Sequence, residues 1–215
     1  MIRFTFKHFL RSVLLALCVS IPLQATTITD APNDFLATFT GTHSSDIDAL
    51  SVFATFDGVT FHIGATVNAS VGTLPTALYV FGVNRGAQTA NFAQLGLPGV
   101  VFDSVITITG AGVTGGRDLA ANAPLVLPPG AAQISGSSFQ IDVPLALLPS
   151  LGLSPLEYGF NLWPRDASQV GDAQIADFAP NSTVFTASAV PEPSSVLLLL
   201  FGAFTLVMVR PLVRQ

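Results

Sequence analysis

Four aspartates in the first quarter of the chain have a spacing that suits the binding of a cation. Asp30 and Asp34 flank a Pro-Asn turn, and Asp46 and Asp48 would point the same way from an extended strand. Oxygen ligands from such turns suit Ca²⁺, which accepts irregular coordination. The alternative is that each aspartate bonds nearby backbone groups, as turn aspartates commonly do, because the sequence has no D-x-D-x-D-G loop. We therefore expect calcium as the candidate metal at these four positions and no other cofactor.

A second group of residues, further along the chain, has the side chains that a sugar-binding site uses. Tyr158 and Trp163, together with Tyr79, would offer rings on which a sugar stacks, and Arg165 and Asp166 would bond its hydroxyls. The alternative is a buried strand. Tyr158 begins the alternating run Y-G-F-N-L-W, and at least one face of that run must belong to a core.

The sequence shows no catalytic constellation. His43 and His62 are the only histidines after residue 25, and their spacing does not place them on one helical face. There is no G-x-S-x-G nucleophile motif, and Glu157 is the sole glutamate between residues 26 and 189. The only cysteine, Cys18, lies in the first apolar run. We predict no catalytic residues and no enzymatic activity, with a hydrolase built from scattered aspartates as the enzymatic alternative.

The charge balance argues against a nucleic-acid partner. Residues 26 to 189 hold three arginines, no lysine and twelve acidic residues, which gives a net charge of −9. Binding to a polyphosphate needs clustered lysine and arginine. An acidic surface without lysine is better suited to staying soluble outside the cell or to holding a cation.

Short alternating apolar runs, broken by Gly, Pro, Asn and Asp, predict an all-β domain over residues 26–186. The clearest unit joins residues 47–56 to residues 59–67 through Asp57-Gly58, which predicts a two-residue hairpin turn with positive φ at both positions. About eight strands at this spacing favour an antiparallel β-sandwich. Besides the hairpin, we expect strands at residues 35–40, 77–83, 100–109, 138–143, 158–163 and 183–187. A short helix is expected at 144–150 and a long loop at 110–130.

The first 25 residues have the layout of a secretory signal peptide. Basic residues precede a short apolar core from Ser12 to Ile21, and a polar exit follows. We predict a signal helix that is cut after Ala25. A first transmembrane helix is the alternative, for which the apolar core is short.

The last 25 residues have the layout of a membrane anchor. Residues 187–195 are interpreted as a linker that contains Pro191, Glu192 and Pro193, whose prolines favour an extended backbone. Residues 196–215 are interpreted as a transmembrane helix and a basic tail, with Arg210 and Arg214 on the cytoplasmic side. A buried C-terminal core helix is the alternative.

Pro-Glu-Pro, an apolar span and terminal arginines, together with a signal peptide, resemble the PEP-CTERM sorting signal of Gram-negative exported proteins. The resemblance covers residues 190–215. It implies that Pro191, Glu192 and Pro193 are recognised by an exosortase-type membrane protease and that the span is discarded after cleavage. It also implies that the product reaches the cell surface or the extracellular matrix.

The middle of the chain is similar, in strand rhythm and acidic turns, to exported β-sandwiches of the DOMON and carbohydrate-binding-module class. The segments that carry this similarity are DFLATFTG, DIDALSVFATFDG, ALYVFGVNRG and FNLWPRD.

The sequence as a whole predicts an exported, non-enzymatic surface or matrix protein, which begins as a precursor anchored in the inner membrane. The expected partners are the secretion machinery and signal peptidase, the exosortase-type protease and, transiently, the inner membrane. A carbohydrate-binding module acting on extracellular polysaccharide is the alternative function.

Overall fold

The computed structural model describes residues 26–190, and the turn at Asp57 and Gly58 joins two central strands of its first sheet. β2 (Ala49–Phe56) and β3 (Thr60–Val67) pair antiparallel across this turn, so the predicted hairpin is confirmed. The predicted turn conformation is wrong, because only Gly58 of the two turn residues has a positive φ, of 96°. Asp57 stabilises the turn differently: its Oδ1 accepts hydrogen bonds from the N–H groups of Val59 and Thr60.

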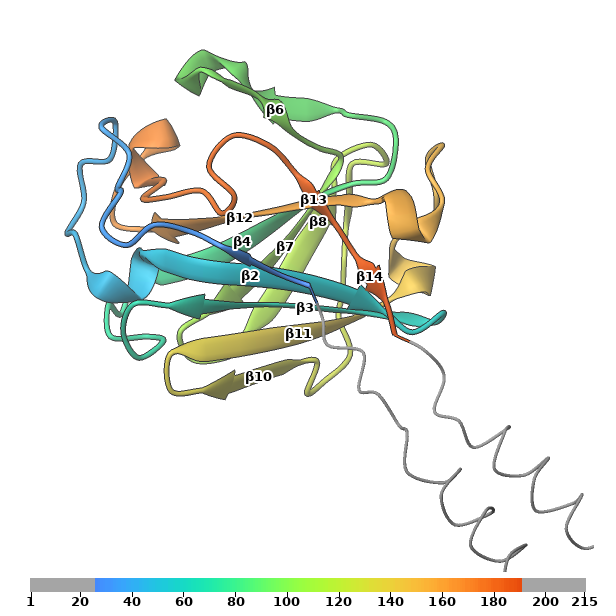
Figure 1. Cartoon of the computed structure of the whole chain (residues 1–215), viewed down its shortest axis with the longest axis horizontal. Coiled ribbons are helices and arrows are strands. Elements are labelled where there is room, and N and C mark those ends of the chain that lie inside the picture. Colours follow the sequence, from blue (N-terminus) through green and yellow to red (C-terminus); the bar gives the residue numbers. More distant parts are fainter. Residues whose placement is uncertain (1–25, 191–215) are drawn as a thin grey trace, which may run out of the picture. The chain divides into compact units, whose positions relative to one another are not determined.

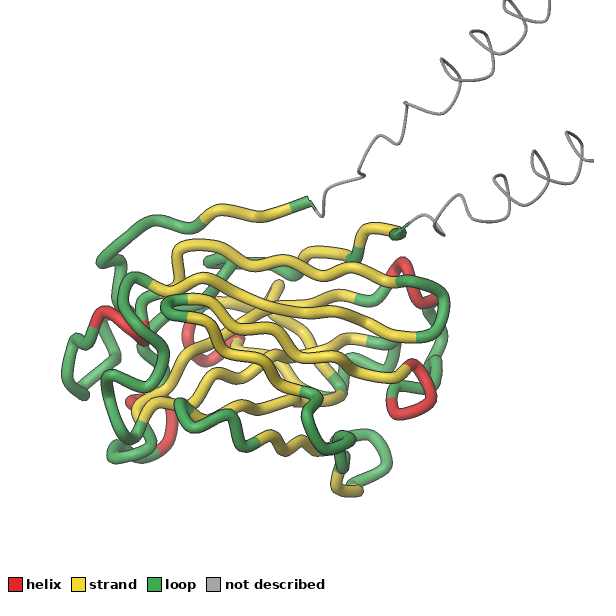
Figure 2. Tube along the Cα trace, turned by 90° about the horizontal axis from the view of Figure 1, so that it is seen from below, coloured by secondary structure: helices red, strands yellow, loops and turns green. Residues whose placement is uncertain are grey.

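Two six-stranded sheets make up most of the described chain (Figures 1 and 2). The first sheet runs in the order β1 (Thr27–Thr29), β2, β3, β11 (Ser138–Pro144) and β10 (Ala132–Ser135), and β14 (Ser188–Ala189) also pairs with β2. The second runs in the order β13 (Phe185–Thr186), β12 (Gly159–Asp166), β4 (Ala77–Asn84), β7 (Ser104–Thr109), β8 (Thr114–Asp118) and β9 (Ala123–Pro124). The β14–β2 pair is parallel and the other pairs are antiparallel. The all-β class is therefore shown, and the paired sheets are consistent with a β-sandwich.

The main core lies between the two sheets and follows the alternation of their strands. Every second residue of β3 and β11 turns inward to meet inward side chains of β4 and β12. Large members of this core are Phe61, Ile63, Phe139, Ile141, Tyr79, Phe81, Tyr158, Phe160 and Leu162.

A second apolar cluster covers the outer face of the second sheet. The hairpin of β5 (Ala90–Phe92) and β6 (Leu97–Phe102) contributes Phe92, Val100 and Phe102, which cluster with Trp163 and Phe178. β4 and β12 are therefore buried on both faces, which explains why their sequences contain so few polar side chains.

The described helices are short 3-10 turns at the ends of the sheets. They are η1 (Ser45–Ile47), η2 (Ala93–Leu95), η3 (Leu145–Leu147), η4 (Pro155–Glu157) and η5 (Gly171–Gln174). Within residues 26–190, none is long and apolar enough to cross a membrane.

Several predicted elements differ from the structure. Residues 35–40 form a loop with a turn at Ala37–Thr38, and its apolar side chains pack against the core without joining a sheet. The predicted loop at 110–130 contains β8, which pairs with β7, and β9, which pairs with β8, because backbone pairing needs no apolar side chain. The predicted helix at 144–150 is only the turn η3.

The predicted domain boundary at residue 186 also needs correction. Ala187 is buried and β14 pairs with β2, so the first residues of the predicted linker belong to the sheet. The predicted signal helix, sorting motif and transmembrane helix lie outside the described residues.

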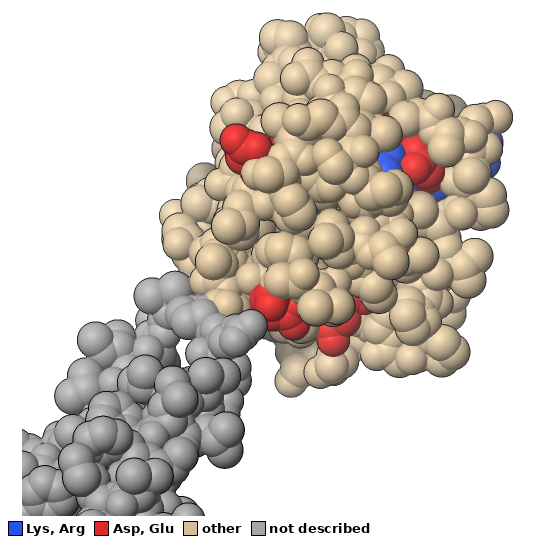
Figure 3. Space-filling model, turned by 90° about the vertical axis from the view of Figure 1, so that its right-hand side faces the viewer, with Lys and Arg blue, Asp and Glu red and all other residues tan. Residues whose placement is uncertain are grey.

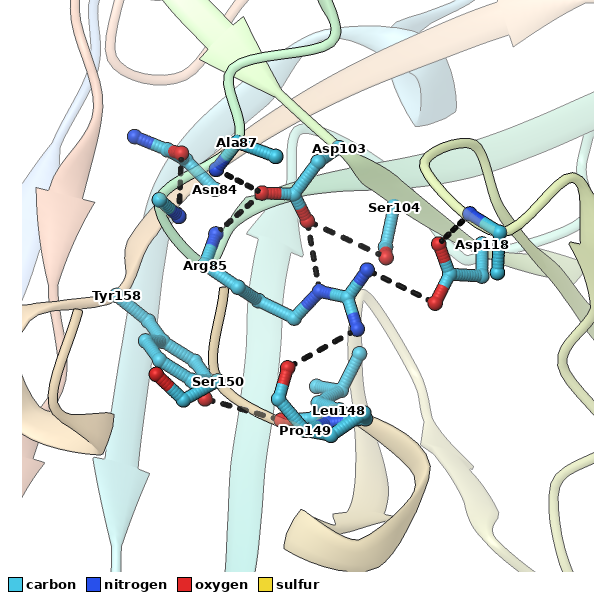
Figure 4. A network of polar contacts seen from close by, with 12 residues as sticks. Asn84, Arg85, Ala87, Asp103, Ser104, Asp118, Leu148, Pro149, Ser150 and Tyr158 are labelled. Atoms are coloured by element: carbon cyan, nitrogen blue, oxygen red, sulfur yellow. Dashed lines mark hydrogen bonds and ion pairs between the residues drawn. The ribbon is translucent and has the colours of Figure 1, made fainter. Parts of the chain in front are cut away.

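The predicted strand at 100–109 is two strands in different sheets, separated by Asp103. The Asp103 carboxylate is buried and accepts hydrogen bonds from the backbone N–H groups of Arg85 (2.7 Å) and Ala87 (3.2 Å). Its other oxygen accepts a bond of 2.7 Å from Arg85 Nε (Figure 4). The chain therefore changes sheet at Asp103, where a buried carboxylate finds its donors.

Arg85 completes this buried polar network. Its guanidinium lies 2.9 Å from Asp118 as an ion pair and donates to the Pro149 carbonyl at 3.2 Å. Burial alone would raise the pKa of Asp118, but hydrogen bonds from the backbone and from Arg85 hold it below its usual value. Two carboxylates thus depend on one buried cation.

Replacing Arg85 with methionine should destabilise the protein by about 3–5 kcal/mol, because two buried carboxylates lose their cation. Arg117→Met is the matched control, since Arg117 is exposed, and it should change stability by less than about 0.5 kcal/mol. Denaturant unfolding of both variants measures the difference. Equal stability of the two would show that Arg85 is not needed to hold the carboxylates.

Candidate metal centre

Two neighbouring aspartates of the first segment meet a third, distant in the sequence, beside the start of β2. Carboxylate oxygens of Asp30, Asp34 and Asp177 all lie within 4.8 Å of one another. Asp30 directly follows β1, Asp34 follows a turn in which Asn33 has a φ of 63°, and Asp177 comes from the segment after η5. We call these three residues the aspartate cluster.

Backbone hydrogen bonds to β2 hold two members of the aspartate cluster in place. The Asp30 N–H donates to the Leu50 carbonyl at 2.9 Å, which extends the pairing of β1 with β2. Asp177 is fully buried, and its Oδ2 accepts the Ala49 N–H at 2.9 Å while its Oδ1 accepts the Phe178 N–H at 2.7 Å. Both carboxylates are therefore fixed against the same end of one strand.

The side chain of Asn181 links the carboxylates of Asp30 and Asp34. Its Nδ2 donates to Asp30 Oδ1 at 3.2 Å and to Asp34 Oδ2 at 3.0 Å. Asp30 Oδ2 and Asp34 Oδ1 are shielded from solvent and have no hydrogen-bond donor within residues 26–190. Buried carboxylate oxygens normally have partners, so these two are exceptions that call for one.

The electrostatics of the aspartate cluster are unfavourable as long as only protein groups are counted. Burial, and next the charge of Asp34, raises the pKa of Asp30 to about 7. Burial, followed by the charges of Asp30 and Asp34, raises the pKa of Asp177 to about 8. Residues 26–190 contain no lysine, and none of their arginines forms an ion pair with these carboxylates. A bound cation would remove the repulsion and supply the missing partner.

The donor set of the aspartate cluster fits a hard cation. Carboxylate oxygens are ligands that calcium prefers, and calcium tolerates the irregular geometry that two separate segments provide. The side-chain amide of Asn181 would offer its oxygen after rotation by half a turn, because amide oxygen and nitrogen are nearly isosteric. With no cysteine and no histidine in the cluster, zinc is a poorer match.

Two of the four predicted calcium ligands lie in the aspartate cluster, and the other two do not. Asp30 and Asp34 do come together, but Asp46 and Asp48 lie in and just after η1, and they already have hydrogen-bond donors. Asp48 accepts bonds from the Asn33 N–H and from Asn68 Nδ2. Asp48 therefore supports the turn that leads into Asp34 and is not itself in the cluster.

Asp46 is similarly occupied in the core. It accepts hydrogen bonds from the Ser44 hydroxyl, the Leu74 N–H and the Tyr79 hydroxyl. Burial, with smaller contributions from Asp46, raises the pKa of Tyr79 above its usual value. Asp46 is a buried structural acceptor that fixes Tyr79 and the loop at Leu74.

The predicted sugar-stacking platform does not form. Tyr158 is buried in the main core, where its hydroxyl donates to the Leu148 carbonyl at 3.0 Å. Trp163 is only 2% exposed and lies on the opposite face of the sheet, under the β5–β6 hairpin. Tyr79 is also buried. The alternating run that starts at Tyr158 therefore supplies core residues on both of its faces.

Of the two polar residues of that prediction, Asp166 has hydrogen-bond donors, whereas the buried Nε of Arg165 has no hydrogen-bond partner within residues 26–190. Asp166 is buried and accepts hydrogen bonds from the Thr76 hydroxyl and the Ser168 N–H. Burial alone would raise the pKa of Asp166, but these bonds lower it. Arg165 is half-buried, and its desolvation lowers the pKa of the guanidinium although Asp172 opposes this. The hydrogen bonds of Asp166 therefore hold the end of β12 in place.

The two histidines after residue 25 lie far apart in the fold. His62 lies between two carboxylates, with Nδ1 2.7 Å from Asp142 and Nε2 3.3 Å from Asp57. Burial alone would lower the pKa of His62, but these bonds raise it. His43 is exposed and stacks on Phe35, at 4.5 Å between ring centroids. They do not form a shared site.

Calcium should raise the melting temperature of the full chain, and by more at pH 8 than at pH 5. Because the pKa values of Asp30 and Asp177 are raised from 3.8 to about 7 and about 8, the calcium-free folded protein holds more protons than the unfolded chain above about pH 4, and its stability falls from there until the pH has passed both values. At a hundredfold excess over Kd the gain is about 2.7 kcal/mol, or roughly 5–10 °C. Thermal melts of chelator-treated protein, with and without calcium at both pH values, measure it.

Asp34→Asn and Asp172→Asn form a matched pair for the same measurement. The first removes a carboxylate charge from the aspartate cluster and should abolish the calcium shift, while raising the calcium-free melting temperature at pH 8. The second alters a carboxylate outside the cluster and should leave the shift intact. A calcium shift that persists in Asp34→Asn would rule out the aspartate cluster as its source.

Comparison with known proteins adds no relative to this geometry. No protein-family model matches the chain, and no curated protein matches it either. The candidate metal centre therefore rests on the contacts and charges of its own residues.

Proposed function

We propose that this chain is an exported, non-enzymatic protein of the cell surface or extracellular matrix, sorted by its C-terminal PEP-CTERM-like signal. The observation that carries the proposal is the order of segments along the chain. The last backbone hydrogen bond of the described domain joins the Val190 N–H to the Phe56 carbonyl at 2.9 Å. Pro191 is the next residue, followed by Glu192, Pro193, an apolar run and terminal arginines.

The same order suits processing at both ends of the chain. Signal peptidase removes residues 1–25 during secretion, and the C-terminal segment holds the precursor in the inner membrane. An exosortase-type protease then cuts near Pro191–Pro193 and releases the domain to the surface or matrix. The folded domain is left whole by both cuts, because its backbone pairing begins at Thr27 and its last backbone hydrogen bond is made by Val190.

Calcium has a specific structural role in this proposal. After the N-terminal cut the protein has no cysteine, so no disulfide can cross-link the domain in the oxidising environment outside the cell. A cation in the aspartate cluster would join the first segment of the domain, through Asp30 and Asp34, to its last segment, through Asp177. Extracellular calcium modules commonly bind with Kd values of about 10⁻⁴–10⁻³ M, which matches calcium levels outside cells.

Sugar binding, the alternative function, loses the platform that suggested it. Tyr158 and Trp163 are buried in separate clusters, so neither ring offers a face to a ligand. A carbohydrate-binding module would need another surface. A polysaccharide pull-down with the secreted product distinguishes the two functions.

Glu192→Gln should block C-terminal processing in a host that has the exosortase-type protease. The full-length chain would then accumulate in the membrane fraction, because the acidic residue of the motif is lost. Glu157→Gln is the matched control: Glu157 caps η4 at the protein surface, and glutamine preserves such a cap. Intact-mass spectrometry of a chain tagged directly after the predicted signal-peptide cut reads out both variants.

The wild-type chain and Glu157→Gln should both yield surface material that ends near the Pro-Glu-Pro motif. An intact C-terminus on wild-type surface material would refute the proposed sorting mechanism. Equal processing of Glu192→Gln would remove Glu192 from the recognised motif.

A further inference from the structure

Both ends of the described domain leave from the same end of β2. β1 runs antiparallel to β2, with Thr27 opposite Phe53, whereas β14 runs parallel to it, with Ser188 opposite Thr55. The first strand and the last strand therefore lie along one edge of β2 (Figures 1 and 2). The Thr26 N–H donates to the Ser188 hydroxyl at 3.2 Å, which ties the two ends together.

We call the end of the sheets at which these strands leave the exit end. It contains the turn at residues 57–59, the last residue of β11, which pairs with Thr60, and the start of β12, which pairs with the last residue of β4. The opposite end contains the start of β4, which pairs with Asp166. Because β2 has 8 residues, the two ends are separated by about 26 Å, at ~3.3 Å per residue.

The surface of the exit end is mostly uncharged. Figure 3 views the molecule from this side and shows a few separate acidic groups, one of them beside basic side chains, in a field of uncharged side chains. Val59 and Val190 are exposed here, and Leu151 lies nearby because its N–H bonds to Arg85, one residue beyond β4. Exposed apolar side chains of this kind tolerate the polar–apolar boundary of a lipid headgroup layer.

We propose that the exit end faces the lipid surface in the membrane-anchored precursor. This inference rests on the proposed function, which holds the precursor in the inner membrane by its C-terminal segment. Five residues, 191 to 195, separate Val190 from the predicted span. Fully extended they cover at most about 17 Å. That is less than the ~26 Å between the two ends of the sheets, so the domain cannot reverse and present its opposite end.

The geometry has a consequence for the order of folding and cleavage. Since β1 and β14 leave β2 in the same direction, both terminal segments can enter one bilayer while both strands stay paired. The domain can therefore complete its fold before either cut is made. The processing enzyme then reaches its motif in the gap between the exit end and the membrane.

Lipid quenching of single labels tests this orientation. The full-length precursor, with Cys18→Ser to remove its only cysteine, is reconstituted in vesicles whose headgroups carry a nitroxide quencher. A fluorophore is attached at Val59→Cys or at Val170→Cys. These valines are 69% and 82% exposed and lie at the exit end and beyond the opposite end of β12, respectively. Both substitutions leave the core untouched.

The label at position 59 should be quenched at least several-fold more strongly than the label at position 170. Equal quenching, or stronger quenching at 170, in protein that sediments with the vesicles would overturn the orientation while leaving the proposed function in place. A precursor that does not sediment with vesicles at all would overturn the proposed function and this inference with it.

Discussion

The other features of the domain depend on the backbone hydrogen bonds along the outer edge of β2. Along this one edge, Ala49 donates its N–H to Asp177, Leu50 accepts from Asp30, and β1 and β14 pair with the residues that follow. The aspartate cluster lies at one end of the edge, and both chain ends leave at the other. An edge strand with unpaired backbone groups invites aggregation, and here the two termini cover it.

Buried charge is handled in two opposite ways in a domain that has no lysine. Arg85 is shared by Asp103 and Asp118, so two carboxylates deep in the fold have a protein cation. Within residues 26–190, Asp30, Asp34 and Asp177 have none, and two of their oxygens lack even a hydrogen-bond donor. The first group is complete without a ligand. The second is stable at neutral pH only by holding protons or a cation, which makes it the place where the solvent composition can act on the fold.

The same edge relates the candidate metal centre to the proposed export route. Asp30 and β1 come from the segment that directly follows the predicted signal peptide, and Asp177 and β14 come from the segment before the predicted anchor. A cation in the aspartate cluster would therefore hold together the two parts of the domain that processing leaves as free ends. This is the mechanical task that disulfides perform in many exported domains.

Local sequence was sufficient wherever neighbours along the chain decide the structure. The alternation around Asp57-Gly58 predicts the β2–β3 hairpin, and the turn that brings Asp34 back toward Asp30 follows from Pro32 and Asn33. Distant contacts were not accessible in this way. Asp177 is bonded to a residue 128 positions away, and no motif in its own segment points to that partner.

The alternating residues of β12 show where sequence alone stops. Their pattern predicted a strand and two faces, and it left open whether Trp163 lies in a core or on a surface. Tertiary structure decided this, because the β5–β6 hairpin folds over the outer face of the second sheet and buries the ring. The physical reason is that periodicity records which side of a strand a residue occupies, whereas burial depends on what a remote segment places over that side.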